Sequence, residues 1–113
     1  MGPVGAERAE EEFVYVIEGA PDAWIDGVLH PLKPGDSVGF PAGTGIAHTF
    51  INNTDAEVRL LVVGEKREDS QFFYPLHPER PLEREFFWEG HPEHDLGPHD
   101  GMPDRVRAKK AGR

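Results

Sequence analysis

Glycine and proline occupy about a fifth of the positions in this chain, and this density limits the fold more than any other feature of the sequence. There are 13 Gly and 11 Pro among the 113 residues. Proline breaks a helix interior and glycine weakens it, whereas both residues favour tight turns. The sequence therefore excludes a helical bundle and predicts short strands joined by turns. A chain of this length can bury one small hydrophobic core.

The charge balance narrows the classes of partner. The chain has 21 acidic and 12 basic residues, a formal net charge of -9. Such a charge repels phosphate groups, so we expect no nucleic-acid and no membrane partner. No apolar run is long enough to span a bilayer, and residues 1–12 do not resemble a signal peptide, so we expect a cytoplasmic protein. Because there is no cysteine, a metal would have to be held by His and carboxylate groups.

Residues 11–18 alternate between two kinds of side chain with a period of two, which is typical of a β-strand with one buried face. One face would carry Phe13, Tyr15 and Ile17, and the other would carry Glu12, Val14, Val16 and Glu18.

Two turn motifs divide the segment that follows. Asp26-Gly27 lies between two apolar runs and predicts a β-hairpin with a type I′ turn. Lys33-Pro34-Gly35-Asp36 predicts a second turn. Further strands are expected at residues 37–40, 48–53 and 57–63, which together indicate an all-β sandwich or small barrel.

Two motifs resemble those of the cupin superfamily. Glu12 and Gly19 have the spacing at the end of the family's first motif, and the second motif is matched in order by Gly35, Pro41, Gly43, His48 and Asn52, with Thr44-Gly45 as a two-residue insertion. The resemblance covers about residues 10–64. It implies a cupin-type double-stranded β-helix, that is, a jelly-roll barrel. Since cupins usually have strands before the first motif, the N-terminal strands would be lacking here.

The resemblance also implies a metal site inside the barrel. The family's site consists of a His-x-His pair, a Glu and the second-motif His. Glu12 and His48 fit the last two positions, and strand alternation would direct both into the interior. No His-x-His pair precedes Glu12, but Glu7 occupies one of the missing positions and is the candidate third ligand. The metals implied are Mn, Fe, Ni or Zn, and one His with two carboxylates would favour Mn or Fe.

A mainly apolar barrel interior would suit a small organic ligand with an apolar part. The residues expected to line it are Val14, Val16, Val38, Phe40, Phe50, Asn52 and Leu61. The family resemblance implies dioxygenase, isomerase or lyase chemistry, and the residues single out no catalytic group. The alternatives are a metal-free ligand-binding or assembly module with a degenerate metal site, and a truncated form of a longer active cupin.

The sequence divides into an N-terminal segment (residues 1–10), a barrel core (11–64) and a C-terminal arm rich in Pro and charge (65–113). We expect the arm to pack on the barrel or on a partner subunit through its aromatic clusters, 72–74 and 86–88. An open sheet edge favours aggregation, so we expect a homodimer, with Phe13, Tyr15 and Ile17 in the buried surface.

Overall fold

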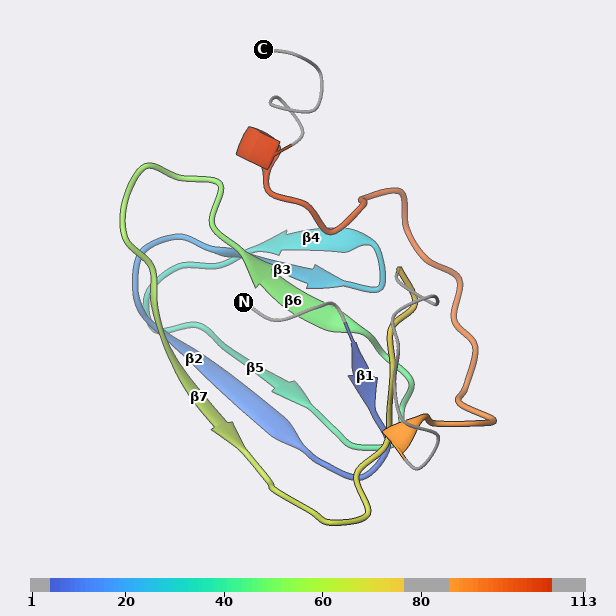
Figure 1. Ribbon diagram of the computed structural model, residues 1–113. Helices are drawn as coiled ribbons and strands as arrows, with labels where there is room; N and C mark the ends of the chain where they lie inside the picture. The colour runs from blue at the N-terminus through green and yellow to red at the C-terminus, as the bar shows by residue number, and fades with distance from the viewer. Residues whose placement is uncertain (1–4, 77–85, 107–113) are drawn as a thin grey trace.

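The computed structural model describes residues 5–76 and 86–106, and this part of the chain is all-β (Figure 1). Residues 1–4, 77–85 and 107–113, which belong to the predicted N-terminal segment and arm, lie outside the described residues. The strands are β1 (Ala6–Glu7), β2 (Glu12–Glu18), β3 (Asp22–Ile25), β4 (Val28–Pro31), β5 (Ser37–Phe40), β6 (His48–Ile51), β7 (Arg59–Gly64) and β8 (Phe72–Phe73).

The strands form two three-stranded sheets and one short pair, and all pairings within them are antiparallel. One sheet has the order β5-β2-β7, the other has the order β4-β3-β6, and β1 pairs with β8. The two larger sheets share a core, because one buried cluster contains side chains of β2, β3, β5 and β6, namely Val14, Ala23, Phe40 and Phe50. This arrangement confirms the predicted all-β class.

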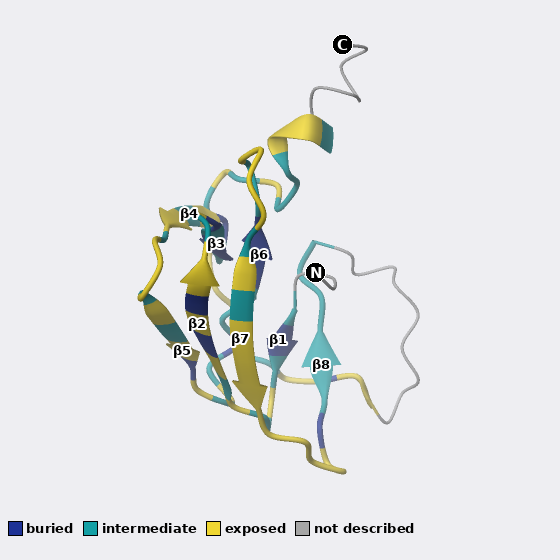
Figure 2. Cartoon of the chain, turned by 90° about the vertical axis from the view of Figure 1, so that its left-hand side faces the viewer, coloured by how far each residue is buried: buried dark blue, intermediate teal, exposed yellow. Residues whose placement is uncertain are grey.

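The alternation predicted for β2 is present in the structure. Val14 and Val16 are almost completely buried, whereas Phe13, Tyr15 and Ile17 are between 39% and 52% exposed. One face of β2 therefore contributes to the core and the other faces outward (Figure 2).

The predicted hairpin is also confirmed. β3 and β4 pair in register around Asp26 and Gly27, which have φ angles of 45° and 88°. Positive φ at both central residues is the requirement of a type I′ turn, and glycine meets it without strain.

Two predicted strands are shorter than expected. The strand predicted at 48–53 ends at Ile51, because the Asn52 side chain organises a loop. Its amide donates to the carbonyl of Ala56 at 2.8 Å, and its Oδ1 accepts from the backbone N–H of Thr54 at 2.9 Å. The next strand begins only at Arg59. Side-chain bonds of this kind compete with a strand ladder.

The described part of the arm lies against the other elements at several points. β8 pairs with β1, and the indole of Trp88 is buried in a second core cluster with Ala6, Trp24, Ala47 and Ile51. The Trp24 Nε1–H donates to the carbonyl of His99 at 3.0 Å. In the described residues no helix is long and apolar enough to cross a membrane.

Candidate functional site

A hydrogen-bonded carboxylate and imidazole lie at the centre of the candidate site. The Nε2 of His48, on β6, is 2.8 Å from the Oε1 of Glu12, on β2. The His48 ring stacks on Phe40, with centroids 3.6 Å apart and planes 6° apart, and meets Phe50 edge-on. The side chains of His48 and Glu12 are 14% and 27% exposed. An apolar wall thus fixes the ring while its Nε2 bonds to the carboxylate.

The second ring nitrogen of His48 is unused by the described residues. Nδ1 is buried, and no hydrogen-bond partner lies within reach. Because a carboxylate can only accept, Nε2 must carry the hydrogen of this bond. In the neutral ring, Nδ1 is then a free acceptor, and a ligand hydroxyl or a water would satisfy it.

Glu7 lies beside this pair because β1 contacts β6. The N–H of His48 donates to the carbonyl of Gly5 at 3.2 Å, and the N–H of Gly43 donates to the carbonyl of Glu7 at 3.2 Å. These bonds fix the backbone of β1 next to the strand that carries His48.

The environment of Glu7 makes its carboxyl group easy to protonate. Burial above all, together with the carboxylates of Glu10 and Glu12, raises its pKa from the usual 4.5 to about 6, although His48 acts in the opposite direction. A carboxyl with a pKa of about 6 exchanges protons near neutral pH, which suits a general acid or base.

These side chains surround a small cavity of about 10 Å³, close to the room that one water needs. The loop after β5 contributes Pro41, Thr44 and Ile46 to its lining. The lining consists of Glu7, Glu10, Glu12, Phe40, Pro41, Thr44, Ile46 and His48. No Lys or Arg is in this lining, so the described surroundings of the cavity are acidic.

The metal centre implied by the family resemblance does not fit this geometry. Glu12 and His48 do converge, as predicted, but no three His, Asp or Glu side chains within residues 5–76 and 86–106 are placed to hold a metal ion. A catalytic metal site in a protein normally has at least three protein ligands. Among the described residues, Glu7 is a neighbour of the pair in the cavity lining and does not complete a set of three metal ligands.

Most residues predicted to line the interior lie around the shared core. Val14, Phe40 and Phe50 belong to one buried cluster, Val38 packs against it, and Val16 is fully buried. Two of them, Phe40 and Phe50, contact the ring of His48.

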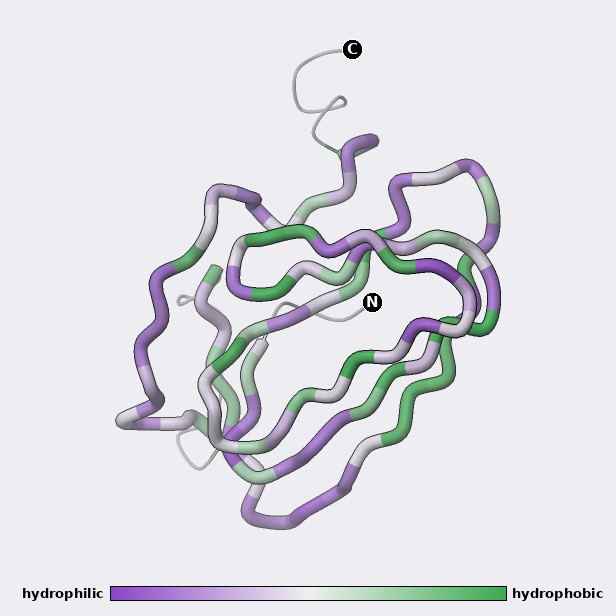
Figure 3. Tube along the Cα trace, turned by 180° about the vertical axis from the view of Figure 1, so that it is seen from behind, coloured by the Kyte–Doolittle hydropathy of each residue, from purple (hydrophilic) through white to green (hydrophobic). Residues whose placement is uncertain are grey.

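Two lining predictions are wrong. Leu61 is 50% exposed and pairs with Tyr15 on the outward face, whereas Leu60 packs on the core cluster. The amide of Asn52 is engaged in the loop after β6. The four apolar residues 60–63 follow one another without a polar residue (Figure 3), so their sequence gave no alternation from which to choose the inward face.

The arm contributes a contact to the loop that covers the cavity. The His94 Nε2 is 2.6 Å from the carbonyl of Thr44, and its Nδ1 is 3.9 Å from the Oδ2 of Asp26. Asp26 in turn accepts from the N–H of Ala47 at 2.8 Å. No local sequence signal indicates this contact, because the two residues are fifty positions apart.

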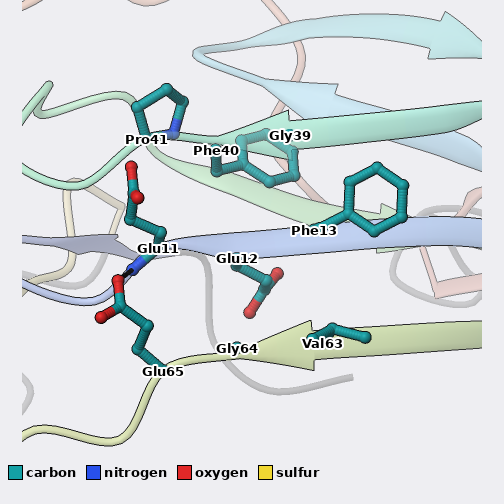
Figure 4. Close-up of a pocket in the computed structure, with 9 residues that line it drawn as sticks. All are labelled: Glu11, Glu12, Phe13, Gly39, Phe40, Pro41, Val63, Gly64 and Glu65. Carbon is teal, nitrogen blue, oxygen red and sulfur yellow. Dashed lines mark hydrogen bonds between the residues drawn. The ribbon is translucent and has the colours of Figure 1, made fainter.

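A larger hollow of about 490 Å³ lies at one end of the β5-β2-β7 sheet (Figure 4). It is lined by Glu11, Glu12, Phe13, Gly39, Phe40, Pro41, Val63, Gly64 and Glu65. Phe13, Gly39 and Val63 are direct cross-strand neighbours, so they share the outward face of the sheet. The hollow therefore opens on the outer surface, and it adjoins the small cavity beside His48, with which it shares Glu12, Phe40 and Pro41.

Comparison with solved structures finds two similar crystal structures. A sugar phosphate isomerase of the cupin superfamily from Silicibacter pomeroyi is 38% identical, with a TM-score of 0.62, over 65% of this chain and 46% of that chain. A candidate sugar phosphate isomerase from Acidithiobacillus ferrooxidans is 32% identical, with a TM-score of 0.61, over 64% of this chain and 46% of that chain.

A curated relative also matches this chain over only part of its length. Protein SchB of Streptomyces halstedii is 43% identical over 51 residues, which are 45% of this chain and 36% of that protein. The chain thus spans less than half the length of each of these relatives.

The model of the Cupin domain family matches residues 3–64, more than half of the chain. The match includes β2 to β7 and both members of the Glu12–His48 pair. It agrees with the similarity to a crystal structure from the cupin superfamily, and the protein belongs to this superfamily.

Proposed function

We propose that this cupin binds a small, uncharged, hydroxylated organic ligand beside His48 and moves a proton between two of its carbon atoms, as a metal-independent isomerase. The observation that carries the proposal is the Glu12–His48 hydrogen bond next to a carboxyl, Glu7, that titrates near neutral pH. Isomerase chemistry is supported by the two similar structures, which are a sugar phosphate isomerase and a candidate for one.

The reaction needs a base and an acid and no redox cofactor. In a hydroxy-carbonyl compound the base removes a proton from the carbon next to the carbonyl, and the electrons of that C–H bond form an enediolate. An acid returns a proton to the neighbouring carbon while the hydroxyl proton moves to the former carbonyl oxygen, which completes the isomerisation with no change in composition. Glu7 would transfer the carbon-bound proton, and His48, held by Glu12, would accept a hydrogen bond from the substrate hydroxyl at its free Nδ1.

The charge of the cavity argues for a substrate without a phosphate group. Three carboxylates line it, from Glu7, Glu10 and Glu12, and no Lys or Arg does so among the described residues. A phosphate here would be repelled without a cation to compensate. A free sugar or a similar polyol derivative fits better than a sugar phosphate.

Ligand entry requires the loop of residues 41–47 to move outward, since the cavity holds about one water. Two single bonds join this loop to the site strands, from the N–H of Gly43 to the carbonyl of Glu7 at 3.2 Å and from the N–H of Ala42 to Oε2 of Glu11 at 3.4 Å. Both are long for hydrogen bonds of this type. The contacts of Thr44 with His94 at 2.6 Å and of the Ala47 N–H with Asp26 at 2.8 Å are shorter, so opening of the whole loop would also have to break them.

The test is proton exchange on free sugars. EDTA-treated protein is incubated in D₂O with a panel of unphosphorylated aldoses and ketoses, and deuterium incorporation next to the carbonyl is followed by NMR. We expect exchange that falls about 100-fold or more in Glu7→Gln. Glu57→Gln, on a side chain 78% exposed and outside the cavity lining, is the matched control and should exchange like wild type.

Two results would overturn the proposal. One is the absence of exchange and of any thermal shift with every sugar tested. The other is near-stoichiometric Mn, Fe, Ni or Zn in purified protein that is lost in His48→Ala, because activity would then belong to a metal site.

An assembly module is the second candidate function. The specific observation in its favour is the contrast between the cavity of about 10 Å³ at His48 and the hollow of about 490 Å³ on the outer surface. Protein that shows no sugar exchange but self-associates would support this alternative.

A further inference from the structure

A second cavity, of about 170 Å³, lies between the C-terminal arm and the β3–β4 turn. The turn, the loop before β6, the segment around β8 and the arm all contribute to it. Its lining consists of Asp26, Gly45, Phe73, Pro75, His91, Glu93, His94 and Leu96. None of these residues lines the cavity at His48, so what binds here is independent of the proposed function.

The arm is anchored on both sides of this cavity. Before it, the His91 ring stacks on Phe73, with centroids 3.6 Å apart and planes 1° apart, and the buried Trp88 meets both rings at a steep angle. After it, the N–H of Gly97 donates to the carbonyl of Asp26 at 2.7 Å, where the arm passes the turn (Figure 1). The cavity therefore has walls that are in place before any ligand arrives, which reduces the cost of binding.

The loop before β6 forms a close contact with the arm at one edge of the cavity. Gly45 has a φ of 77°, and a Cβ there would lie 2.7 Å from the carbonyl oxygen of Pro92 and 3.2 Å from Nε2 of His94. Loop and arm thus meet without a side chain between them. The cavity beside them is a gap that the packed segments leave open.

The charges of the lining favour a cation. Asp26 and Glu93 contribute carboxylates, and no Lys or Arg among the described residues lies in the lining. The side chain of Asp26 is only 17% exposed, so its charge is weakly screened by solvent. A metal ion does not fit, because no three His, Asp or Glu side chains in residues 5–76 and 86–106 are placed to hold one.

Two hydrogen-bond acceptors face each other in this lining. The Nε2 of His94 is 2.6 Å from the carbonyl of Thr44, and since a carbonyl only accepts, Nε2 carries the hydrogen. In the neutral ring Nδ1 is then an acceptor, and it lies 3.9 Å from Oδ2 of Asp26. The other carboxylate oxygen, Oδ1, is occupied by the N–H of Ala47.

This pair of acceptors lacks a donor. No hydrogen bond joins Nδ1 of His94 or Oδ2 of Asp26 to another described residue. Two acceptors cannot bond to each other, and 3.9 Å is beyond hydrogen-bond distance. A single nitrogen with two N–H groups, placed between them, can be within bonding distance of both.

We propose that this cavity binds a small organic ammonium ion, namely a primary amine with a short apolar chain. The –NH₃⁺ group has three donors and no acceptor. One N–H would donate to Nδ1 of His94 and another to Oδ2 of Asp26, and the carboxylate of Glu93 would add to the compensation of its charge. The apolar chain would lie against Phe73, Pro75 and Leu96. The chain must be short, because common ligand pockets of about 300–1,000 Å³ are larger than this one.

The arrangement predicts a selectivity that general attraction to an acidic protein does not. Tetramethylammonium has the same charge but no N–H group, and 1-butanol has a short apolar chain but no charge. n-Butylammonium satisfies both requirements. It should bind at least about tenfold more tightly than either of the other two compounds, since hydrogen bonds between charged groups are the strong ones.

The experiment titrates the full chain with n-butylammonium chloride at about pH 7.5 and follows the imidazole ¹⁵N signals by NMR. We expect saturable binding that shifts Nδ1 of His94. Asp26→Asn should weaken binding at least about tenfold, because the amide Oδ1 keeps the bond to Ala47 while Nδ2, itself a donor, replaces Oδ2. Glu93→Gln, on an exposed residue of the arm, should weaken it severalfold.

Glu57→Gln, on a side chain 78% exposed and outside the lining, is the matched control and should bind like wild type. Circular dichroism checks that all three variants are folded. The inference is overturned if no saturable binding occurs up to about 10 mM amine, a very weak affinity, or if tetramethylammonium binds equally well. It is also overturned if Asp26→Asn and Glu93→Gln both retain the wild-type affinity.

Two further NMR results would count against this site. If the amine shifts the signals of His48 and leaves those of His94 unchanged, it binds in the other acidic cavity. If His94 in the ligand-free protein already carries hydrogens on both ring nitrogens, Nδ1 is a donor to Asp26 and the pair of acceptors does not exist. Either result overturns the inference without bearing on the sugar exchange expected at His48.

Discussion

Gly97, in the C-terminal arm, packs directly on the backbone of Gly27, in the β3–β4 turn. A Cβ on Gly97 would lie 2.5 Å from the carbonyl oxygen of Gly27, closer than real Cβ atoms approach. The N–H of Gly97 also donates to the carbonyl of Asp26 at 2.7 Å. Residue 97 must therefore be a glycine, because no side chain fits between it and the turn.

Gly97→Ala should therefore separate the arm from the turn. We expect the free energy of unfolding to fall by about 1–3 kcal/mol, the usual cost of overpacking. Urea denaturation measures it. Gly39→Ala is the control, because its Cβ would enter open space and the residue lies in a strand. An equal loss in both variants would contradict the steric explanation.

The stability of the protein should depend on pH through Glu7. Its folded-state pKa is raised to about 6, mainly by burial, from the usual 4.5. The folded state thus binds this proton more tightly than the unfolded state. The stabilisation from the proton is fully present below pH 4.5 and is lost as pH rises to 6. Since the group is only half-buried, solvent screening limits the effect to about 1 kcal/mol.

The variant Glu7→Gln isolates this effect. It should be more stable than wild type at pH 7 and should lack the decrease in stability between pH 4.5 and 6. Urea midpoints at pH 4.5, 6 and 7.5 give the comparison, and ¹³C NMR follows the Glu7 carboxyl directly. A wild-type profile that matches the variant throughout this window would refute the assignment.

The Glu12–His48 bond makes a prediction about the imidazole. Nε2 must carry the hydrogen, so ¹⁵N NMR of the neutral ring should show the Nε2–H tautomer. Glu12→Ala leaves both ring nitrogens of a largely buried His48 without a protein partner and should lower stability by about 1–3 kcal/mol. An Nδ1–H tautomer in wild type would contradict the hydrogen-bond arrangement.

Asp26 combines an unusual backbone conformation with a side-chain bond. Its φ is 45°, and its Oδ1 accepts from the N–H of Ala47 at 2.8 Å. Asparagine tolerates positive φ and keeps the acceptor. Asp26→Asn should therefore retain most of the stability, whereas Asp26→Ala should lose about 1–2 kcal/mol. Thermal unfolding compares the two, and equal losses would show that the bond to Ala47 contributes nothing.

The sequence predicted the elements whose signal is local. The alternation in β2 and the Asp26-Gly27 turn each depend on a few adjacent residues, and both are present. The inward face of β7 was not predictable, because residues 60–63 are uniformly apolar. The two-residue strand β1 carries no periodic signal, and its partner β8 lies more than sixty residues away.

The same distinction holds at the site. Glu12 and His48 were predicted together because each lies at a defined motif position, and they do form a bond. The stacking of Phe40 on His48 and the contact of His94 with Thr44 depend on how separate segments meet in space. Such contacts cannot be predicted from the spacing of residues along the chain.

The pairing of β1 with β8 has a consequence for any attempt to isolate the barrel. The family match ends at residue 64, yet the strand that carries Glu7 finds its ladder partner at Phe72–Phe73. A fragment cut at residue 64 would keep Glu12 and His48 but release the strand that brings a third carboxyl to them. The smallest unit that preserves the whole acid–base cluster is thus longer than the smallest unit recognisable as a cupin.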